Sequence, residues 1–223
     1  MAYVLISDLM YGDTDKRIKA RVSRQWDYHD LNDETKIYHT DLVLLDEKGN
    51  SIHVQIYPPT MINLRTLLQE GKVYYFDSFS VRYANRTYRP VTNPLMISFT
   101  KWTTLEECID ASDDFPAITF SLTPFQDAPS LVDKNAFYVD IMGVITEIGA
   151  TDTLRPKSRN TETLKRTMQI WDASNSTLPI TLWGNTATAF NAEEIYNAGQ
   201  KKPQVIIFVG TVVKNYKGIG ISL

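Results

Sequence analysis

The sequence of 223 residues contains one cysteine and three histidines, and it has no run of 18 or more apolar residues. The single Cys108 excludes an internal disulfide and a structural zinc site built from several thiolates. A membrane-spanning helix needs a longer apolar run than this sequence offers. The first residues also lack the basic start, apolar stretch and cleavage site of a secretory signal. We therefore expect neither secretion nor membrane insertion.

A catalytic pattern is also missing. His29, His39 and His53 lie in the first half without the spacing of metal ligands. No GxxxxGK[ST] phosphate loop occurs, and the adjacent Glu193 and Glu194 would point apart on a helix. We expect a protein that is not an enzyme and that needs no cofactor and no metal.

The charge is unevenly distributed along the chain, which has a formal net charge of -3. Residues 1–105 carry 13 Lys+Arg against 12 Asp+Glu, residues 106–134 carry 1 against 7, and residues 135–223 carry 9 against 7. The acidity is thus concentrated in the middle, where three prolines also occur. Such a segment is typical of a boundary between domains.

Most other segments alternate between apolar and polar residues or run apolar over four to eight residues, as in SIHVQIY, KVYYFDSFSV, LPITLWG and QVIIFVGTVV. This pattern predicts antiparallel strands. Helical patterns are short and occur at 60–70 and 186–199, the second ending at Gly199. The sequence therefore predicts an all-β protein with few helices.

The two halves repeat one pattern. LVLLDEKGNSIHVQIY matches MQIWDASNSTLPITLW, with 11 residues both from Asp46 to Tyr57 and from Asp172 to Trp183. Each half reads as five strands with a short helix between the third and fourth, which is the order of the OB-fold barrel. We predict two tandem five-stranded OB-fold barrels: domain 1 at 1–105, an acidic connector at 106–116 and domain 2 at 117–223.

In an OB-fold the binding face lies on strands 2 and 3 and is flanked by the loops that join strands 1–2 and 4–5. The alternation of SIHVQIY places His53, Gln55 and Tyr57 on that face. Each predicted strand 4–5 hairpin carries cations and one tyrosine. The candidates in the first domain are Tyr57, His53, Arg82, Arg86, Tyr88 and Arg89, and those in the second are Trp183, Lys214, Tyr216 and Lys217.

The second domain adds a basic strand 1–2 loop with Arg155, Lys157, Arg159, Lys165 and Arg166, whereas the first domain's loop DYHDLNDETK is acidic. Flat rings beside cations suit a single-stranded nucleic acid, because every base has a face that can stack and cations attract the phosphates. A single-stranded nucleic acid is therefore the ligand that these residues favour.

Eight blocks of the sequence, in order over essentially the whole chain, carry a family resemblance: KARVSRQW, LDEKGNSIHVQIY, KVYYF, ANRTYRPVTN, FPAITFSLT, VDIMGV, TLWG and VKNYKG. The sequence resembles the tandem DNA-binding domains A and B of the replication protein A large subunit, especially its plant relatives. The resemblance implies stacking by Tyr57, Tyr88, Trp183 and Tyr216, and polar strand contacts by His53, Arg82 and Lys214.

The same resemblance implies a nuclear protein that coats single-stranded DNA with little sequence preference in replication, repair or recombination. Other replication protein A-like subunits or repair proteins are its implied partners, and a membrane is not among them.

Two alternatives stay open at the level of sequence. OB-folds also bind peptides, so a protein-interaction module is one of them, and the acidic loop 27–36 would suit a basic partner. The other alternative is RNA, because stacking does not sense the 2′-hydroxyl. The aromatic residues at the strand ends also have a simpler reading as exterior barrel residues, and the arginines and the basic loop as solvated charges.

Overall fold

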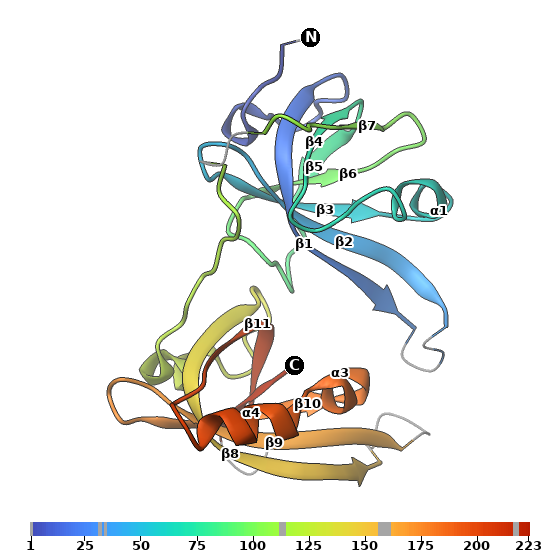
Figure 1. Ribbon diagram of the computed structural model, residues 1–223. Helices are drawn as coiled ribbons and strands as arrows, with labels where there is room; N and C mark the ends of the chain where they lie inside the picture. Colours follow the sequence, from blue (N-terminus) through green and yellow to red (C-terminus); the bar gives the residue numbers. More distant parts are fainter. Residues whose placement is uncertain (1, 31–32, 34, 112–114, 156–161, 216–218) are drawn as a thin grey trace. The chain divides into compact units, whose positions relative to one another are not determined.

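The computed structural model describes the chain except residues 1, 31–32, 34, 112–114, 156–161 and 216–218 (Figure 1). The chain divides into two compact units, Met1–Thr119 and Phe120–Leu223. Strands dominate both units, and the helices among the described residues are short. The expectation of a mostly β protein is confirmed.

The first unit follows the expected order of strands and helix. Its elements are η1 (Ile6–Asp8, a 3-10 helix), β1 (Arg17–His29), β2 (Ile37–Leu45), β3 (Ser51–Ile56), α1 (Thr60–Leu64), β4 (Val73–Asp77), β5 (Ser80–Tyr83), β6 (Leu95–Ser98) and β7 (Thr104–Glu107).

The strands of the first unit form one sheet in the order β5-β6-β3-β2-β1-β4-β7. Strands β4 and β5 lie near opposite ends of this order, yet Ser78 and Phe79 alone separate them along the chain. The sheet must therefore curl until its two sides meet. Ser78 has a φ of 58°, a left-handed conformation that turns the chain sharply between the two strands.

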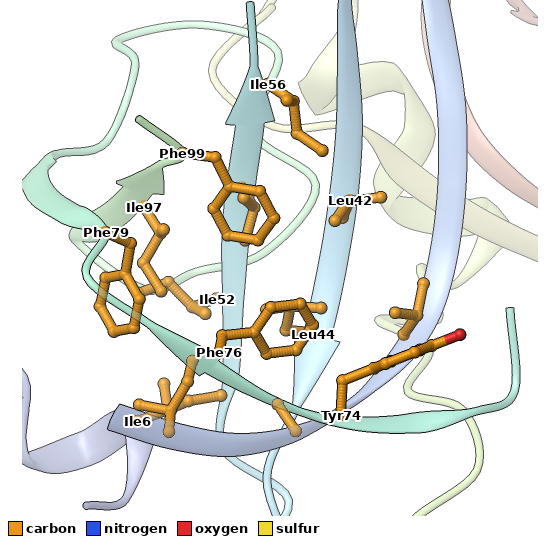
Figure 2. Close-up of a cluster of buried hydrophobic side chains, with 14 of the residues drawn as sticks. Ile6, Leu42, Leu44, Ile52, Ile56, Tyr74, Phe76, Phe79, Ile97 and Phe99 are labelled. Atoms are coloured by element: carbon orange, nitrogen blue, oxygen red, sulfur yellow. The ribbon is translucent and has the colours of Figure 1, made fainter. Parts of the chain in front are cut away.

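The curled sheet encloses one apolar core. Ile52, Val54 and Ile56 of β3 are fully buried, as the alternation of SIHVQIY predicted. Figure 2 shows the side chains of this core pointing toward one another from β2, β3, β4, β6 and the segment between β4 and β5. Those labelled there are Ile6, Leu42, Leu44, Ile52, Ile56, Tyr74, Phe76, Phe79, Ile97 and Phe99.

The second unit repeats this plan with longer strands. Its elements are η2 (Phe125–Asp127), α2 (Ala128–Leu131), β8 (Val139–Leu154), β9 (Thr163–Trp171), β10 (Thr177–Trp183), α3 (Gly184–Ala189), α4 (Ala192–Gly199), β11 (Val205–Asn215) and β12 (Ile219–Ser222).

The strands of the second unit form a closed barrel in the order β10-β12-β11-β8-β9. On β10 the alternate residues Leu178, Ile180 and Leu182 are buried in a second core. The residue after Leu182 is Trp183, which therefore points to the outer face of the barrel.

Three expectations need correction. The first unit's sheet has seven strands instead of five, because the predicted fourth strand bends at Ser78 into β4 and β5, and β7 is added. Residues 106 and 107, expected in the acidic connector, belong to β7 and pair with β4. The helix predicted at 60–70 is shorter in the structure, where α1 ends at Leu64. The helix predicted at 186–199 is two helices, interrupted at Phe190 and Asn191.

Candidate nucleic-acid interface

The outer face of the first unit, which points away from the core, carries aromatic and polar residues in rows across β1, β2 and β3. Trp26 pairs with Asp41, and Asp41 pairs with Gln55. The next row begins with the pair of Tyr28 and His39. Tyr57 completes this second row, because it directly follows the pair formed by Ile56 and Thr40.

Asp41 links two histidines on this face. Its Oδ1 lies 2.7 Å from His53 Nε2, and its Oδ2 lies 2.8 Å from His39 Nδ1. His39 is two residues from Asp41 on the same strand, and His53 lies diagonally across on β3, so both rings point to the same side. Burial acts to raise the pKa of Asp41, but hydrogen bonds and charge interactions with the two histidines outweigh it and hold the pKa below its usual value.

The lowered pKa of Asp41 predicts that the stability of the first unit depends on pH. Because the pKa of Asp41 is lower in the folded than in the unfolded chain, its ionised form stabilises the fold above the unfolded pKa of about 3.9. The stabilisation is lost as the pH falls through the folded pKa. We expect the free energy of unfolding, measured with urea between about pH 5 and pH 2, to fall more steeply in the wild type than in Asp41→Asn. Equal slopes would contradict a stabilising role for the ionised carboxylate.

His53 lies on the expected face but does not reach its surface. The side chain is buried, with 3% of the residue exposed, and its ring stacks on Trp26 at a centroid distance of 6.2 Å and an interplanar angle of 6°. With Nε2 engaged by Asp41, the ring supports the face from below. The burial of His53 favours a role in positioning its neighbours over the direct strand contact that the resemblance implies.

Tyr57 and Arg82 are held together at the surface by Gln55. The Gln55 Oε1 accepts a hydrogen bond from the Tyr57 hydroxyl at 3.0 Å and another from the Arg82 guanidinium at 2.7 Å. The Arg82 guanidinium carbon lies 5.9 Å from the centroid of the Tyr57 ring. With 41% of Tyr57 exposed, an aromatic residue and a cation lie side by side at the surface.

The hairpin between β5 and β6 holds the remaining candidates of the first unit. Arg89 donates to the carbonyl oxygens of Thr92 and Asn93, both at 2.9 Å, so it braces the hairpin. Arg86 and Tyr88 are exposed, and Tyr88 has a left-handed φ of 55°. Arg89 is thus a structural residue, while Arg86 and Tyr88 stand at the surface.

In the second unit, Trp183 stands at the end of β10 beside two neighbouring strands. Its indole Nε1 donates to Ser222 Oγ of β12 at 3.0 Å, and its partner across β9 is Lys165. The Lys165 amine lies 3.5 Å from an Asp152 carboxylate oxygen. Trp183 thus has a cation opposite it on the adjacent strand β9, whereas the cation beside Tyr57, Arg82, comes from β5.

Lys214 lies on the same outer face but in another row. Lys214 pairs with Gly220 of β12. Ser222, two residues further along β12, pairs with Thr181, which is still two residues before Trp183 on β10. Its amine lies 3.2 Å from Asn135 Oδ1 and 3.4 Å from Asp133 Oδ1. The structure therefore ties Lys214 to the segment before β8 and does not bring it beside Trp183.

Of the other predicted residues of the second unit, the structure describes only some. Arg155 is exposed just after the end of β8. Arg166 donates to the carbonyl oxygens of Ala187 and Gly149 and to the Thr151 hydroxyl, so it holds the sheet and α3 together. Tyr216, Lys217, Lys157 and Arg159 lie outside the described residues.

Sequence reasoning missed several residues of the first unit's face: Trp26, Tyr28, His39 and Asp41. These residues contact one another across strands, and the sequence does not reveal the register of those strands. Its charge pattern also predicts an acidic loop that starts at Asp27, whereas β1 continues to His29. The alternation of Trp26 and Tyr28 was the available signal, since residues two apart on a strand share a face.

Within the described ranges, no group of three or more His, Cys, Asp or Glu side chains is arranged to hold a metal ion. The helices in this part of the chain are too short or too polar to cross a membrane.

Two family models match the chain, one for each unit. The model described as "Domain of unknown function DUF223" matches residues 8–128, more than half of the chain. The model described as "Replication protein A OB domain" matches residues 130–223.

Among curated proteins, the chain is similar to the "Replication protein A 70 kDa DNA-binding subunit" of Drosophila melanogaster, with 30% identity over 207 residues, covering 90% of this chain and 32% of the relative. A 70 kDa DNA-binding subunit of replication protein A from Oryza sativa subsp. japonica is 29% identical over 75% of this chain and 25% of its own length. One from Arabidopsis thaliana is 24% identical over 92% of this chain and 32% of its own length. The chain thus spans about a third or less of these relatives.

A solved structure of a replication protein A heterotrimer bound to ssDNA contains a chain that superposes on this one with a TM-score of 0.65. The identity is 25%, and the match covers 99% of this chain and 49% of the other. Both units are included in that match. The chain therefore belongs to the DUF223 domain family and is, across both of its units, a relative of the replication protein A 70 kDa DNA-binding subunit.

Proposed function

We propose that the protein is a non-enzymatic single-stranded DNA-binding protein whose two units are both OB-folds and act in the nucleus during replication, repair or recombination. One observation carries the proposal. In each unit an exposed or half-exposed ring at the end of the third strand, Tyr57 or Trp183, stands on the outer face beside a cation, Arg82 or Lys165. The ring offers a base a stacking surface, and the cation offers a phosphate an ion pair.

The names of the relatives support this proposal, because they are DNA-binding subunits and because the matching solved complex contains ssDNA. Tyr57, Tyr88, Trp183 and Tyr216 are proposed to stack with bases. Arg82, Arg86, Lys165, Arg155, Lys157 and Arg159 are proposed to attract phosphates, and Lys214 does so where a phosphate displaces Asp133 and Asn135. Other replication protein A-like subunits are the proposed protein partners.

A titration with fluorescently labelled oligo-dT of about 30 nucleotides tests the proposal. We expect binding at micromolar protein or below in low salt, and weaker binding to duplex DNA of the same length. Binding to the RNA counterpart as tightly as to DNA would make RNA an equal ligand. No binding to any single strand would contradict the function and favour a protein-interaction module.

The same titration at several salt concentrations tests the phosphate contacts. Each neutralised phosphate releases counterions, so the logarithm of the affinity falls with the logarithm of the salt concentration by about 0.7 per contact. Three to six contacts predict a slope of about −2 to −4. A flat plot would argue against phosphate contacts by these arginines and lysines.

A further inference from the structure

A row of three rings crosses the outer face of the first unit at the end of β1 and the start of β2, where a loop joins the two strands. The Tyr28 and His39 rings stack at a centroid distance of 4.9 Å and an interplanar angle of 2°. The His39 and Tyr57 rings follow at 5.2 Å and 54°. Because neighbouring strands are about 4.8 Å apart, one residue from each of three strands produces this continuous row. We call it the aromatic shelf: Tyr28, His39 and Tyr57.

The shelf is both exposed and fixed. Tyr28 is 45% exposed and Tyr57 is 41% exposed, so a large part of each residue faces solvent. Between them, His39 Nδ1 lies 2.8 Å from an Asp41 carboxylate oxygen, and the Tyr57 hydroxyl donates a hydrogen bond to Gln55. Rings that are already fixed lose little conformational freedom when a flat ligand stacks on them.

The charges around the hairpin of β1 and β2 differ from those at Arg82. Arg65 forms an ion pair with Asp27, and Lys36 lies 4.0 Å from Asp30 with its amine 5.1 Å from the Tyr38 ring centroid. Acidic residues thus accompany the cations of this hairpin. A ligand that gains affinity at this end of the face must do so through contacts of its flat, uncharged part, because the carboxylates would repel its phosphates.

We propose that the aromatic shelf is an additional base-stacking site, with Tyr28 receiving one further base of a single strand that already contacts Tyr57. The proposal deepens the proposed function and rests on it. The strand runs from the cationic region around Arg82 and Tyr57 onto the shelf. There the bases stack, and the phosphates stay in solvent.

The decisive test compares Tyr28→Ala with the wild type in the oligo-dT titration at low and moderate salt. We expect an affinity loss of about fivefold or more, the effect of removing one stacked base, with no change in the slope against salt. Tyr28→Phe keeps the ring and should bind as the wild type does. Tyr11→Ala is the matched control, because Tyr11 is 62% exposed and stacks on Tyr83 at 4.5 Å and 18°, on the side of β5 opposite to Arg82.

Each outcome decides between the proposals. Wild-type affinity in Tyr28→Ala, with the wild type binding normally, would overturn the shelf and leave the proposed function standing. A slope that decreases by about 0.7 would also overturn it, since that change reports a lost phosphate contact. Absence of binding by the wild type itself would overturn both.

A second variant keeps the test valid if Tyr28→Ala unfolds. Tyr28→Trp retains a stacking ring and adds a fluorophore on the shelf. We expect unchanged affinity and more quenching on oligo-dT binding than the wild type shows, whereas Tyr11→Trp should add no quenching. Equal quenching in Tyr28→Trp and Tyr11→Trp would overturn the shelf.

Discussion

Replacing Tyr57 and Trp183 together by alanine is expected to weaken oligo-dT binding by about thirtyfold or more. Each ring supplies one stacking surface, and one stacked base contributes about 1–3 kcal/mol, so the pair contributes at least about 2 kcal/mol. Both rings are oriented by a hydrogen bond from within their own unit, from Tyr57 to Gln55 and from Trp183 to Ser222. Fluorescence anisotropy with labelled oligo-dT at low salt measures the loss.

The matched control removes the same two residue types elsewhere. Tyr83, 67% exposed, lies on β5 next to Arg82 but on the opposite side of the strand, and Trp171, 37% exposed, pairs with Thr177 at the start of β10, whereas Trp183 is at its end. Their double alanine variant should bind oligo-dT as the wild type does. If the two double variants lose affinity equally, the rings at the strand ends have no special part in binding.

Removing the Asp46 carboxylate is expected to destabilise the first unit by about 3 kcal/mol, because it leaves buried N–H donors without an acceptor. Asp46 is 1% exposed and accepts hydrogen bonds at 2.9 Å from the backbone amides of Ile6, Lys48 and Asn50 and from the Asn50 side chain. It thereby fixes the turn between β2 and β3 and attaches η1 to it. Urea unfolding of Asp46→Ala against the wild type measures the change.

Asp172→Ala gives the comparison in the second unit. Asp172 occupies the equivalent turn and accepts from the amides of Ser174 and Ser176 and from the Ser174 hydroxyl. The hydrogen bond from the Ser174 hydroxyl is the main cause that holds the pKa of this carboxyl below its usual value. Asp172 is more exposed than Asp46, and among the described residues its hydrogen-bond donors all belong to its own turn, so we expect a smaller loss. A loss as large as that of Asp46→Ala would contradict this account of burial.

Much of the fold could be predicted because its signals are local. The alternation of SIHVQIY and LPITLW determined which side chains of β3 and β10 point into the apolar cores, and the same alternation placed Tyr57 and Trp183 on the outer face. The equal spacing from Asp46 to Tyr57 and from Asp172 to Trp183 corresponds to the same turn in both units. These features need no knowledge of distant contacts.

The remaining features depend on contacts between segments that are distant in sequence. His53 was expected to contact the strand directly, but Asp41 and Trp26 on neighbouring strands bury it. Lys214 was also expected to contact the strand, but Asp133 and Asn135, some eighty residues earlier, hold its amine. Sequence pattern reveals which face a residue occupies, and partners on other strands decide whether it is available there.

The short strand β7 protects one edge of the first unit's sheet. It pairs with β4 from Thr104 to Glu107. Without β7, the backbone groups along this edge of β4 would be open to strands of other molecules. Glu106 and Glu107 are anchored to Arg17 and Lys72 at 2.8 Å each. A strand of four residues with two carboxylates is itself a poor template for further pairing. A chain cut at residue 105 would therefore lose half of this cover and become prone to aggregate through its sheet edge.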